Sequence, residues 1–228
     1  MNKFSRYGFM AIALVFVFSA FAAVATKAQT TNEILTLMDK HYNALKSLRT
    51  NVTYVKYDSN LKDSDTMEGK AIYAKAKNQL FRIDWKSPVE SLAVNGKAYA
   101  IYRPKLNQMI VGNTEKAKKD ASGVSSPLAF IYMSKAQLKA NYTIIYLGEE
   151  KVNGTTPAFH LELTPKTAQT YKVADIWVDG NGMPIQMKTT EKNDNSTSVL
   201  LTSLEKNVTL NGSDFKIDTP KGTKIIKN

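Results

Sequence analysis

The chain has 228 residues, 43% of them hydrophobic and 10% aromatic, and carries 31 Lys and Arg against 20 Asp and Glu, a formal net charge of +11. This composition excludes disorder over the whole chain and is enough for one domain with a full core, or at most two small ones. The absence of cysteine excludes disulfides, thiol nucleophiles, thiolate metal sites and a lipid-modified N-terminal Cys, and two histidines leave little material for a His-based triad or metal centre.

The first segment has the pattern of a secretory signal peptide. Lys3 and Arg6 precede an apolar run over residues 9–18, and small residues follow. Ala25 completes an A-x-A cleavage site and Ala28 a second candidate, so we predict a cleaved leader over residues 1–25, with 28 as the alternative end. An uncleaved membrane anchor is the competing interpretation, but the apolar run is short for a bilayer. Cleavage leaves 29 basic and 20 acidic residues, a net charge of +9, on an exported chain without disulfides, which suits a bacterial periplasm.

The mature chain begins with a predicted helix over residues 31–48. Thr30 and Glu33 form a capping box, and apolar residues then recur on one helical face. The hydrophobic period changes to two after this segment, which indicates strands. We predict that these start at Val52 and continue over residues 68–75, 79–86, 92–94, 99–102 and 107–111, with Asn95-Gly96 as a hairpin turn.

The alternation breaks in the middle of the chain. A polar stretch over residues 112–126 predicts an exposed loop, and the apolar segment after it predicts a short helix over 126–138 that begins with Ser126 and Pro127. Turn-separated strands follow, over residues 142–147, 158–163, 171–178, 184–190, 198–204 and 215–218. The outline predicts a mainly β (α+β) chain in which a curved antiparallel sheet wraps over two apolar helices.

No catalytic or metal-binding pattern emerges along the chain. The acidic loop over residues 58–65 resembles a calcium loop, but its fifth and sixth positions lack the ligand oxygen and the glycine that an EF-hand needs. His160 and Glu162 share a face of a predicted strand, although two ligands alone do not make a metal site. His41 is expected on the surface of the first helix. We therefore expect no catalytic residue, no metal and no cofactor.

The positive charge admits several interpretations. A nucleic acid is an implausible partner for an exported protein, which leaves anionic lipid head groups, an acidic protein, or a solvated surface without a partner. The basic residues are spread along the chain, and the densest group, Lys116, Lys118 and Lys119, is modest.

The distinctive features are apolar. Phe81, Ile83 and Trp85 share one face of a predicted strand, and residues 130–133 are apolar on nearly all sides. Composition alone favours a normal packed core as their role. Several stretches nevertheless occur in a specific order and spacing: Glu68-Gly69, residues 80–88, residues 95–108, residues 119–131, residues 163–166 and residues 215–222.

In these stretches, and over nearly the whole mature chain, the sequence resembles the LolA family of periplasmic outer-membrane lipoprotein carriers. The resemblance implies a strongly curved antiparallel sheet that forms an incomplete barrel, with an α-helical lid over an apolar cavity. Members accept the acyl chains of a lipoprotein from an inner-membrane ABC-type release complex and hand them to an outer-membrane acceptor. Acyl chains need such a shield because each buried CH₂ is worth roughly 0.8 kcal/mol. The expectation is a single carrier domain over residues 29–228, working in the periplasm as a soluble monomer.

The resemblance also suggests site residues. Phe81 falls on the strand that receives cargo, and the family's Arg that holds the lid shut through backbone carbonyls falls at Lys77. Lysine can donate to carbonyls but lacks the planar fork of arginine, and Arg82 is a neighbour that could take this role. The residues expected to line the cavity are Leu37, Met38, Phe81, Ile83, Trp85, Tyr99, Ile101, Phe130 and Ile131.

The departure at Lys77 keeps other functions open. Relatives of the same fold bind other lipids, so a carrier of another lipid or glycolipid is one alternative. A lipid-sensing regulatory domain that signals through a protein partner is a second, and an enzyme acting on envelope lipids or glycans is a third.

Overall fold

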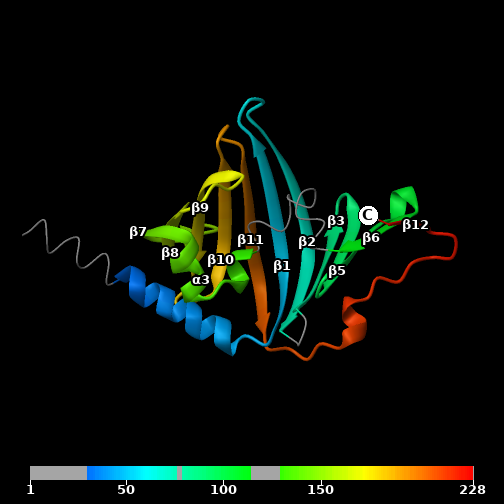
Figure 1. Cartoon of the computed structure of the whole chain (residues 1–228), viewed down its shortest axis with the longest axis horizontal. Helices are drawn as coiled ribbons and strands as arrows, with labels where there is room; N and C mark the ends of the chain where they lie inside the picture. The colour runs from blue at the N-terminus through cyan, green and yellow to red at the C-terminus, as the bar shows by residue number, and fades with distance from the viewer. Residues whose placement is uncertain (1–29, 76–78, 114–128, 228) are drawn as a thin grey trace, which may run out of the picture.

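A computed structural model describes residues 30–75, 79–113 and 129–227 of the chain. These residues form one curved sheet of twelve strands in the order β12-β6-β5-β4-β3-β2-β1-β11-β10-β9-β8-β7 (Figure 1). Neighbouring strands are antiparallel except β12 and β6, which run parallel. The sheet does not close on itself, and its two edges are β7 and β12. The predicted mainly β fold with an incomplete barrel is therefore confirmed.

The strands follow the predicted order with somewhat wider bounds. In the first half they are β1 (Ser47–Asp58), β2 (Asp63–Lys75), β3 (Gln79–Lys86), β4 (Val89–Asn95), β5 (Ala98–Arg103) and β6 (Gln108–Asn113). In the second half they are β7 (Tyr142–Val152), β8 (Thr156–Pro165), β9 (Tyr171–Val178), β10 (Pro184–Glu191), β11 (Ser196–Lys206) and β12 (Lys224–Lys227).

The first helix is present but ends earlier than predicted. It covers residues 30–44, and β1 begins at Ser47 rather than at Val52. Backbone pairing explains the difference, because Leu48 is paired with Tyr73 of β2 and with Lys206 of β11, and these ladder bonds outweigh helical propensity.

The prediction of one helix over residues 126–138 is wrong within the described part of the chain. Residues 129–132 form the 3-10 helix η3 (Ala129–Tyr132), and a separate α-helix, α3 (Lys135–Asn141), follows. The reason lies at Ser134, whose side chain accepts from the backbone of Gln137 while the Gln137 side chain accepts from the Ser134 backbone. This capping box begins a new helix after the apolar segment.

The predicted strand over residues 215–218 is also wrong. Phe215 ends the 3-10 helix η4 (Gly212–Phe215), and the last strand is β12. Residues 207–223 connect β11 to β12 along the outside of the sheet (Figure 1). The connection is held by Arg82 of β3, which donates to the carbonyl oxygens of Asp214 and Lys216.

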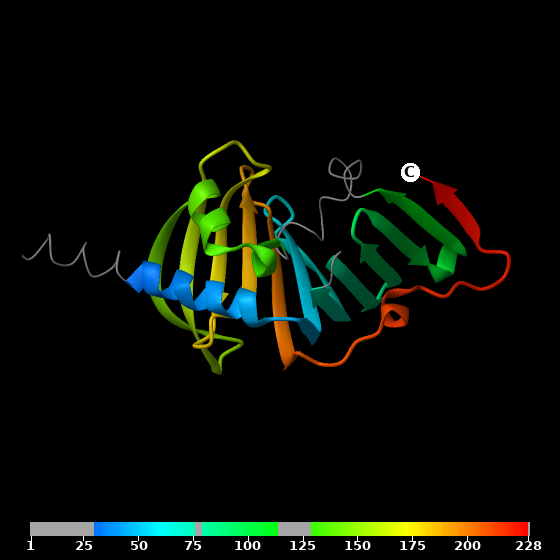
Figure 2. The same cartoon turned by 60° about the horizontal axis from the view of Figure 1, so that its bottom comes forward.

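The two halves of the sheet differ in their cover. The helix of residues 30–44 crosses β7–β11, with α3 beside it, whereas β3–β6 and β12 extend away from both helices (Figure 2). No helix among residues 30–75, 79–113 and 129–227 is long and apolar enough to span a membrane. The predicted leader, the basic group at residues 116–119 and Lys77 lie outside these ranges.

Candidate functional site

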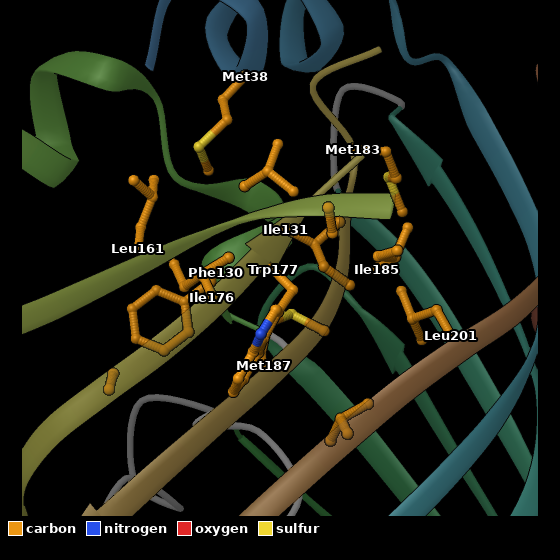
Figure 3. Close-up of a cluster of buried hydrophobic side chains, with 14 of the residues drawn as sticks. Met38, Phe130, Ile131, Leu161, Ile176, Trp177, Met183, Ile185, Met187 and Leu201 are labelled. Atoms are coloured by element: carbon orange, nitrogen blue, oxygen red, sulfur yellow. The ribbon is translucent and has the colours of Figure 1, made fainter. Parts of the chain in front are cut away.

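The main apolar core lies between the helix of residues 30–44 and the covered half of the sheet. Ile34, Leu35 and Met38 of the helix are 1–3% exposed, and Met38 points from the helix toward the strands (Figure 3). Strand residues complete the cluster from β8, β9, β10 and β11, among them Leu161, Ile176, Met187 and Leu201. Met183 and Met187 are fully buried, and flexible thioether side chains suit an irregular interior.

The short helix η3 inserts two side chains into this core. Phe130 is 1% exposed and Ile131 is 6% exposed, and both lie among the labelled core residues in Figure 3. The Phe130 ring packs against Tyr142 with the ring centroids 5.8 Å apart. A 3-10 helix has poorer hydrogen-bond geometry than an α-helix and is used in short pieces. These two residues, which we call the plug, are therefore held by side-chain packing more than by backbone pairing.

The structure gathers most of the predicted cavity residues. Met38, Ile83, Trp85, Phe130 and Ile131 belong to one buried cluster, and the half-buried Phe81 packs against it. Leu37 is half-buried and, together with Tyr99 and Ile101, is not a member of that cluster.

Strand register nevertheless places the predicted residues of β3 and β5 on one face of the sheet. Phe81 is paired with Val94, which is paired with Tyr99. Ile83 is paired with Leu92, which is paired with Ile101. Directly paired residues point to the same side, so the apolar face under the helices continues outward along β4, β5 and β6. Leu92, Val94, Ile101 and Ile110 on this continuation are only half-buried.

Under the plug the core is almost filled. A cavity of about 10 Å³ is lined by residues from four strands and from η3: Leu48, Thr50, Ala71, Ile72, Tyr73, Phe81, Ile131 and Leu201. A space of this size holds about one water molecule, whereas pockets for small ligands are ordinarily about 300–1,000 Å³. The chain's own side chains, Ile131 among them, thus occupy most of the apolar interior at this place.

Sequence reasoning missed the tyrosines at the centre of this region. Tyr54 packs edge-on against Trp85, with the ring centroids 6.0 Å apart, and the hydroxyls of Tyr142 and Tyr171 are 2.6 Å apart. Burial raises the pKa of Tyr73 to about 12 and also raises the pKa of Tyr54. The sign available in the sequence was the spacing of two between Val52 and Tyr54 and between Ala71 and Tyr73, which places each tyrosine on the same face as an apolar neighbour.

Polar bonds tie α3 to the helix of residues 30–44. Lys135 donates from Nζ to Thr36 Oγ1 at 2.7 Å and from its backbone nitrogen to Asp39 Oδ1 at 3.1 Å. Lys139 Nζ donates to Asn32 Oδ1 at 2.9 Å. The two helices therefore form one cover over the core, which we call the lid (residues 30–44 and 135–141).

The lid rests on the turn between β9 and β10. Gly182 has φ +84°, and a Cβ atom there would lie 2.3 Å from the carbonyl oxygen of Leu37. Only glycine permits this approach of helix and turn. The turn is fixed by the Asp179 side chain, which accepts from the backbone nitrogens of Asn181 and Met183.

His41 corrects the expectation of a surface histidine. Its Nε2 atom is buried and has no hydrogen-bond partner among the described residues. Burial and the nearby Lys206 lower the pKa of His41, and Asp179 partly opposes them. His41 is thus a half-buried member of the lid helix whose surroundings favour the neutral imidazole.

A lysine also fastens the C-terminal end of the lid helix. Lys77 lies outside the described residues, but Lys75 of β2 donates from Nζ to the carbonyl oxygen of Tyr42 at 3.1 Å. The same ammonium group lies 4.1 Å from the centre of the Tyr42 ring. Arg82 contacts the segment after β11 instead of the lid. Lys75 therefore places a cation on a carbonyl of the first lid helix, and Lys166 Nζ does the same at the Lys139 carbonyl of α3, at 2.7 Å.

A second hollow lies away from the lid. An open groove of about 740 Å³ separates β4–β6 from the segment around Phe215 to Asp218, and alanines at positions 93, 98 and 100 contribute to its lining. Tyr99 also borders this groove, and its ring covers Gly112, where a Cβ would come within 2.7 Å.

The predicted neighbours His160 and Glu162 do not form a site together. His160 lies between Glu150 and Asp175, with both N···O distances at 2.9 Å, and its ring stacks on Trp177. The indole of Trp177 donates to Glu150 at 2.8 Å, and these bonds lower the pKa of Glu150. No group of three or more possible metal ligands occurs within the described part of the chain, and this cluster cross-links β7, β8 and β9.

Comparison with known proteins shows which family model the sequence matches and which solved structures have a similar fold. The sequence model of the family described as outer membrane lipoprotein carrier protein LolA matches residues 23–218. A search of curated proteins found no match.

Solved structures with low sequence identity share the fold. An uncharacterised conserved protein from Thermus thermophilus is similar at 12% identity with a TM-score of 0.57, covering 87% of this chain and 99% of that chain. A crystal structure of MucB is similar at 15% identity with a TM-score of 0.54, covering 85% of this chain and 63% of that chain. MucB in the Pseudomonas aeruginosa MucA/MucB complex gives 13% identity and a TM-score of 0.50, covering 82% of this chain and 60% of that chain. The chain thus spans about three-fifths of the MucB chains, and at these identities the likeness concerns the fold.

Proposed function

The chain belongs to the LolA family of outer membrane lipoprotein carriers, and from this membership we propose that it is a periplasmic carrier that shields acyl chains from water. The observation that carries the proposal is the apolar face of the sheet. It runs from the closed core under the lid, through Phe81 and Ile83, to the half-buried Leu92 and Ile101 of the uncovered half.

Loading of the core under the lid requires that core to open, because the cavity of about 10 Å³ beside Ile131 cannot hold an acyl chain. We propose that the plug leaves its place under the lid and that acyl methylenes take it. Phe130 and Ile131 sit on a four-residue 3-10 helix, so their movement breaks no strand pairing. The exchange replaces one set of apolar contacts by another, which keeps its free-energy difference small.

The lid supplies the restraint that keeps the empty form closed. Its polar links to the strands and loops include the Lys75–Tyr42 hydrogen bond and the bonds of Lys166 to the carbonyls of Lys139 and Asn141, and the Gly182–Leu37 contact and the buried side chains of the helix add packing. A small number of exposed polar links costs little to break. The larger cost is apolar, because rising exposes Ile34, Leu35 and Met38 at about 1.5–3 kcal/mol each. We therefore propose that the helices rise as a unit when acyl chains cover these side chains, while the sheet stays paired.

In the full form of the proposal, cargo is the acylated end of a lipoprotein. It is received from an inner-membrane ABC-type release complex and delivered to an outer-membrane acceptor, and the carrier works as a monomer. No bond is broken in this cycle, so it needs neither a catalytic residue nor a cofactor. A carrier of another lipid or glycolipid would use the same face and would differ only in its cargo.

A regulatory domain is the second candidate. The structure of P. aeruginosa MucA/MucB shows a protein of this fold in a complex with another protein. A regulator should hold a stable protein partner, whereas a carrier should release its cargo to an acceptor and show exchange of acyl ligand.

The test is mass spectrometry of the mature protein purified gently from its own periplasm, combined with lipid extraction and uptake of a fluorescent acyl probe. The variant Phe81→Glu places a charge on the apolar face, where Phe81 is half-buried. The matched control is Ile145→Glu on β7, because Ile145 is 46% exposed on another part of the sheet. Urea denaturation of both variants checks that they fold.

An acylated lipoprotein bound to the native chain and to Ile145→Glu, but lost in Phe81→Glu, supports the lipoprotein carrier. Recovery of a free phospholipid or glycolipid instead assigns the chain to transport of that lipid. An empty native protein that also takes up no acyl probe would refute both carrier forms, and a co-purified protein partner would then favour the regulatory domain.

A further inference from the structure

One end of the molecule combines exposed apolar side chains with lysines. It consists of the short helix η1 (Pro104–Leu106) with Asn107, and of residues 221–227, which turn into β12. We call this end the basic tip. It lies at the opposite end of the long axis from the helix of residues 30–44 (Figure 1). Leu106 and Ile225 in it are 59% and 64% exposed.

The two segments of the basic tip are fastened to each other. The backbone nitrogen of Lys224 donates to the Asn107 carbonyl at 2.9 Å, and Thr223 Oγ1 donates to Asn107 Oδ1 at 3.1 Å. Asn107 Nδ2 in turn donates to the Gly222 carbonyl at 3.2 Å. Leu106 and Ile225 therefore lie on two segments that hydrogen bonds hold together, and the same two segments continue into the paired strands β6 and β12.

The charge of the basic tip is of one sign. Lys105, Lys221, Lys224 and Lys227 are exposed, and residues 103–113 and 219–227 contain no Asp or Glu. The neighbouring Glu90 is already engaged by Arg103 in an ion pair. Four lysines thus share these two stretches with the two exposed apolar side chains, and the nearest carboxylate along the chain is Asp218, which lines the second hollow together with Lys227.

This combination fits the surface of an anionic bilayer. Lysines near such a surface are attracted to lipid phosphates, and apolar side chains of the same element enter the boundary between head groups and acyl chains. A stable protein interface ordinarily buries at least about 1,000 Å², which a small protruding corner does not present on its own. Insertion into a bilayer needs only the apolar side chains and the lysines of the basic tip.

We propose that the basic tip docks this protein onto bilayers of anionic phospholipid, with the lysines on the phosphates and Leu106 and Ile225 inserted. Docking by this end brings the uncovered half of the sheet toward the membrane and leaves the lid remote from it. The proposal extends the carrier function but does not depend on it, because an empty protein should dock as well.

The experiment is sedimentation of the purified mature protein with vesicles of phosphatidylcholine containing about one-third phosphatidylglycerol, at low and at high salt. The variant Lys105→Gln/Lys221→Gln/Lys224→Gln should bind about 100-fold more weakly, at roughly fivefold for each lysine. Its matched control is Lys56→Gln/Lys151→Gln/Lys192→Gln, which removes the same charge from exposed positions elsewhere. Binding should fall at high salt and should be absent on pure phosphatidylcholine.

A second measurement locates the contact. The chain has no cysteine, so Leu106→Cys can be labelled with an environment-sensitive fluorophore at one site. Leu61→Cys is the control, because Leu61 is 77% exposed on the β1–β2 turn. The label at position 106 should shift to the blue on anionic vesicles, and the label at position 61 should not.

Two results would overturn the proposal: vesicle binding that both lysine triples reduce equally, or a label at position 106 that stays in water. Either would assign the basic tip to an acidic protein partner or to a solvated surface. The failure of the carrier function is separable, since Phe81→Glu should lose acyl uptake while it keeps its affinity for anionic vesicles.

Discussion

Replacing Gly182 by Ala tests whether the lid is seated on the turn between β9 and β10. Gly182 has φ +84°, and an added Cβ would lie 2.3 Å from the Leu37 carbonyl oxygen and 2.8 Å from the Met38 nitrogen. The turn cannot yield easily, because the Asp179 side chain and backbone fix it with several hydrogen bonds. The helix must therefore move outward or detach.

The loss of stability has two parts. A left-handed conformation costs a residue with a Cβ about 1–2 kcal/mol, and overpacking of a tight contact costs typically about 1–3 kcal/mol. Gly182→Ala should therefore lose about 2–5 kcal/mol. Gly154→Ala measures the first part alone, because Gly154 has φ +71° and its added Cβ would meet nothing within 4 Å. Gly180→Ala, in the same turn as Gly182, should lose little stability, because Gly180 has no positive φ and its added Cβ would meet nothing within 4 Å.

The assay is urea denaturation followed by the fluorescence of the two tryptophans, one in each half of the sheet. Trp85 and Trp177 are 4% and 8% exposed, so both should respond to unfolding. Uptake of a fluorescent acyl probe is measured on the same variants, and Gly182→Ala should take up the probe faster because its lid is displaced. Equal stability losses for Gly182→Ala and Gly154→Ala would refute the reasoning, since the contact with Leu37 would then contribute nothing.

Three further changes test the lid and the plug. Below about pH 6.5 the unfolded chain gains a proton at His41 before the folded chain does, because burial and Lys206 lower the folded pKa. The urea midpoint should therefore be lower at about pH 5.5 than at about pH 7.5, and His41→Gln should reduce this difference. A difference that His41→Gln leaves unchanged would contradict the role given to His41. Ile131→Ala should cost about 2–5 kcal/mol in urea denaturation and should tighten acyl-probe binding, whereas unchanged binding would show that Ile131 does not occupy the cargo space. Lys75→Met should lose less than about 1 kcal/mol yet speed probe uptake in stopped-flow fluorescence, and an unaltered rate would show that its bond to the lid is immaterial.

Sequence patterns predicted the strands well where one face is apolar and a turn is encoded. Phe81, Ile83 and Trp85 alternate with Arg82 and Asp84, and the structure turns the three apolar residues inward. Asn95-Gly96 predicted the β4–β5 hairpin, in which Gly96 has φ +58°. Such information is local, because a period of two and a turn residue act within a few positions.

The helices were less predictable because their ends depend on competing partners. Leu48 continues the helical hydrophobic pattern, yet it pairs with Tyr73 of β2 and with Lys206 of β11. The apolar residues Phe130 and Ile131 favour a longer helix in the sequence. In the structure they belong to a 3-10 helix of four residues, and both side chains are buried. Local preference was too weak to decide between these alternatives.

The candidate site shows the same division. The sequence by itself determined the apolar face, since the alternation of Phe81 and Ile83 depends on residues close together along the chain, and the order of short stretches along it indicated the carrier family. Only the tertiary structure decided that the cavity beside Ile131 is about 10 Å³, that Lys75 bonds to the lid helix, and that this helix rests on Gly182. These properties depend on atoms from segments many residues apart, such as Leu37 and Gly182, and no local pattern encodes their distance.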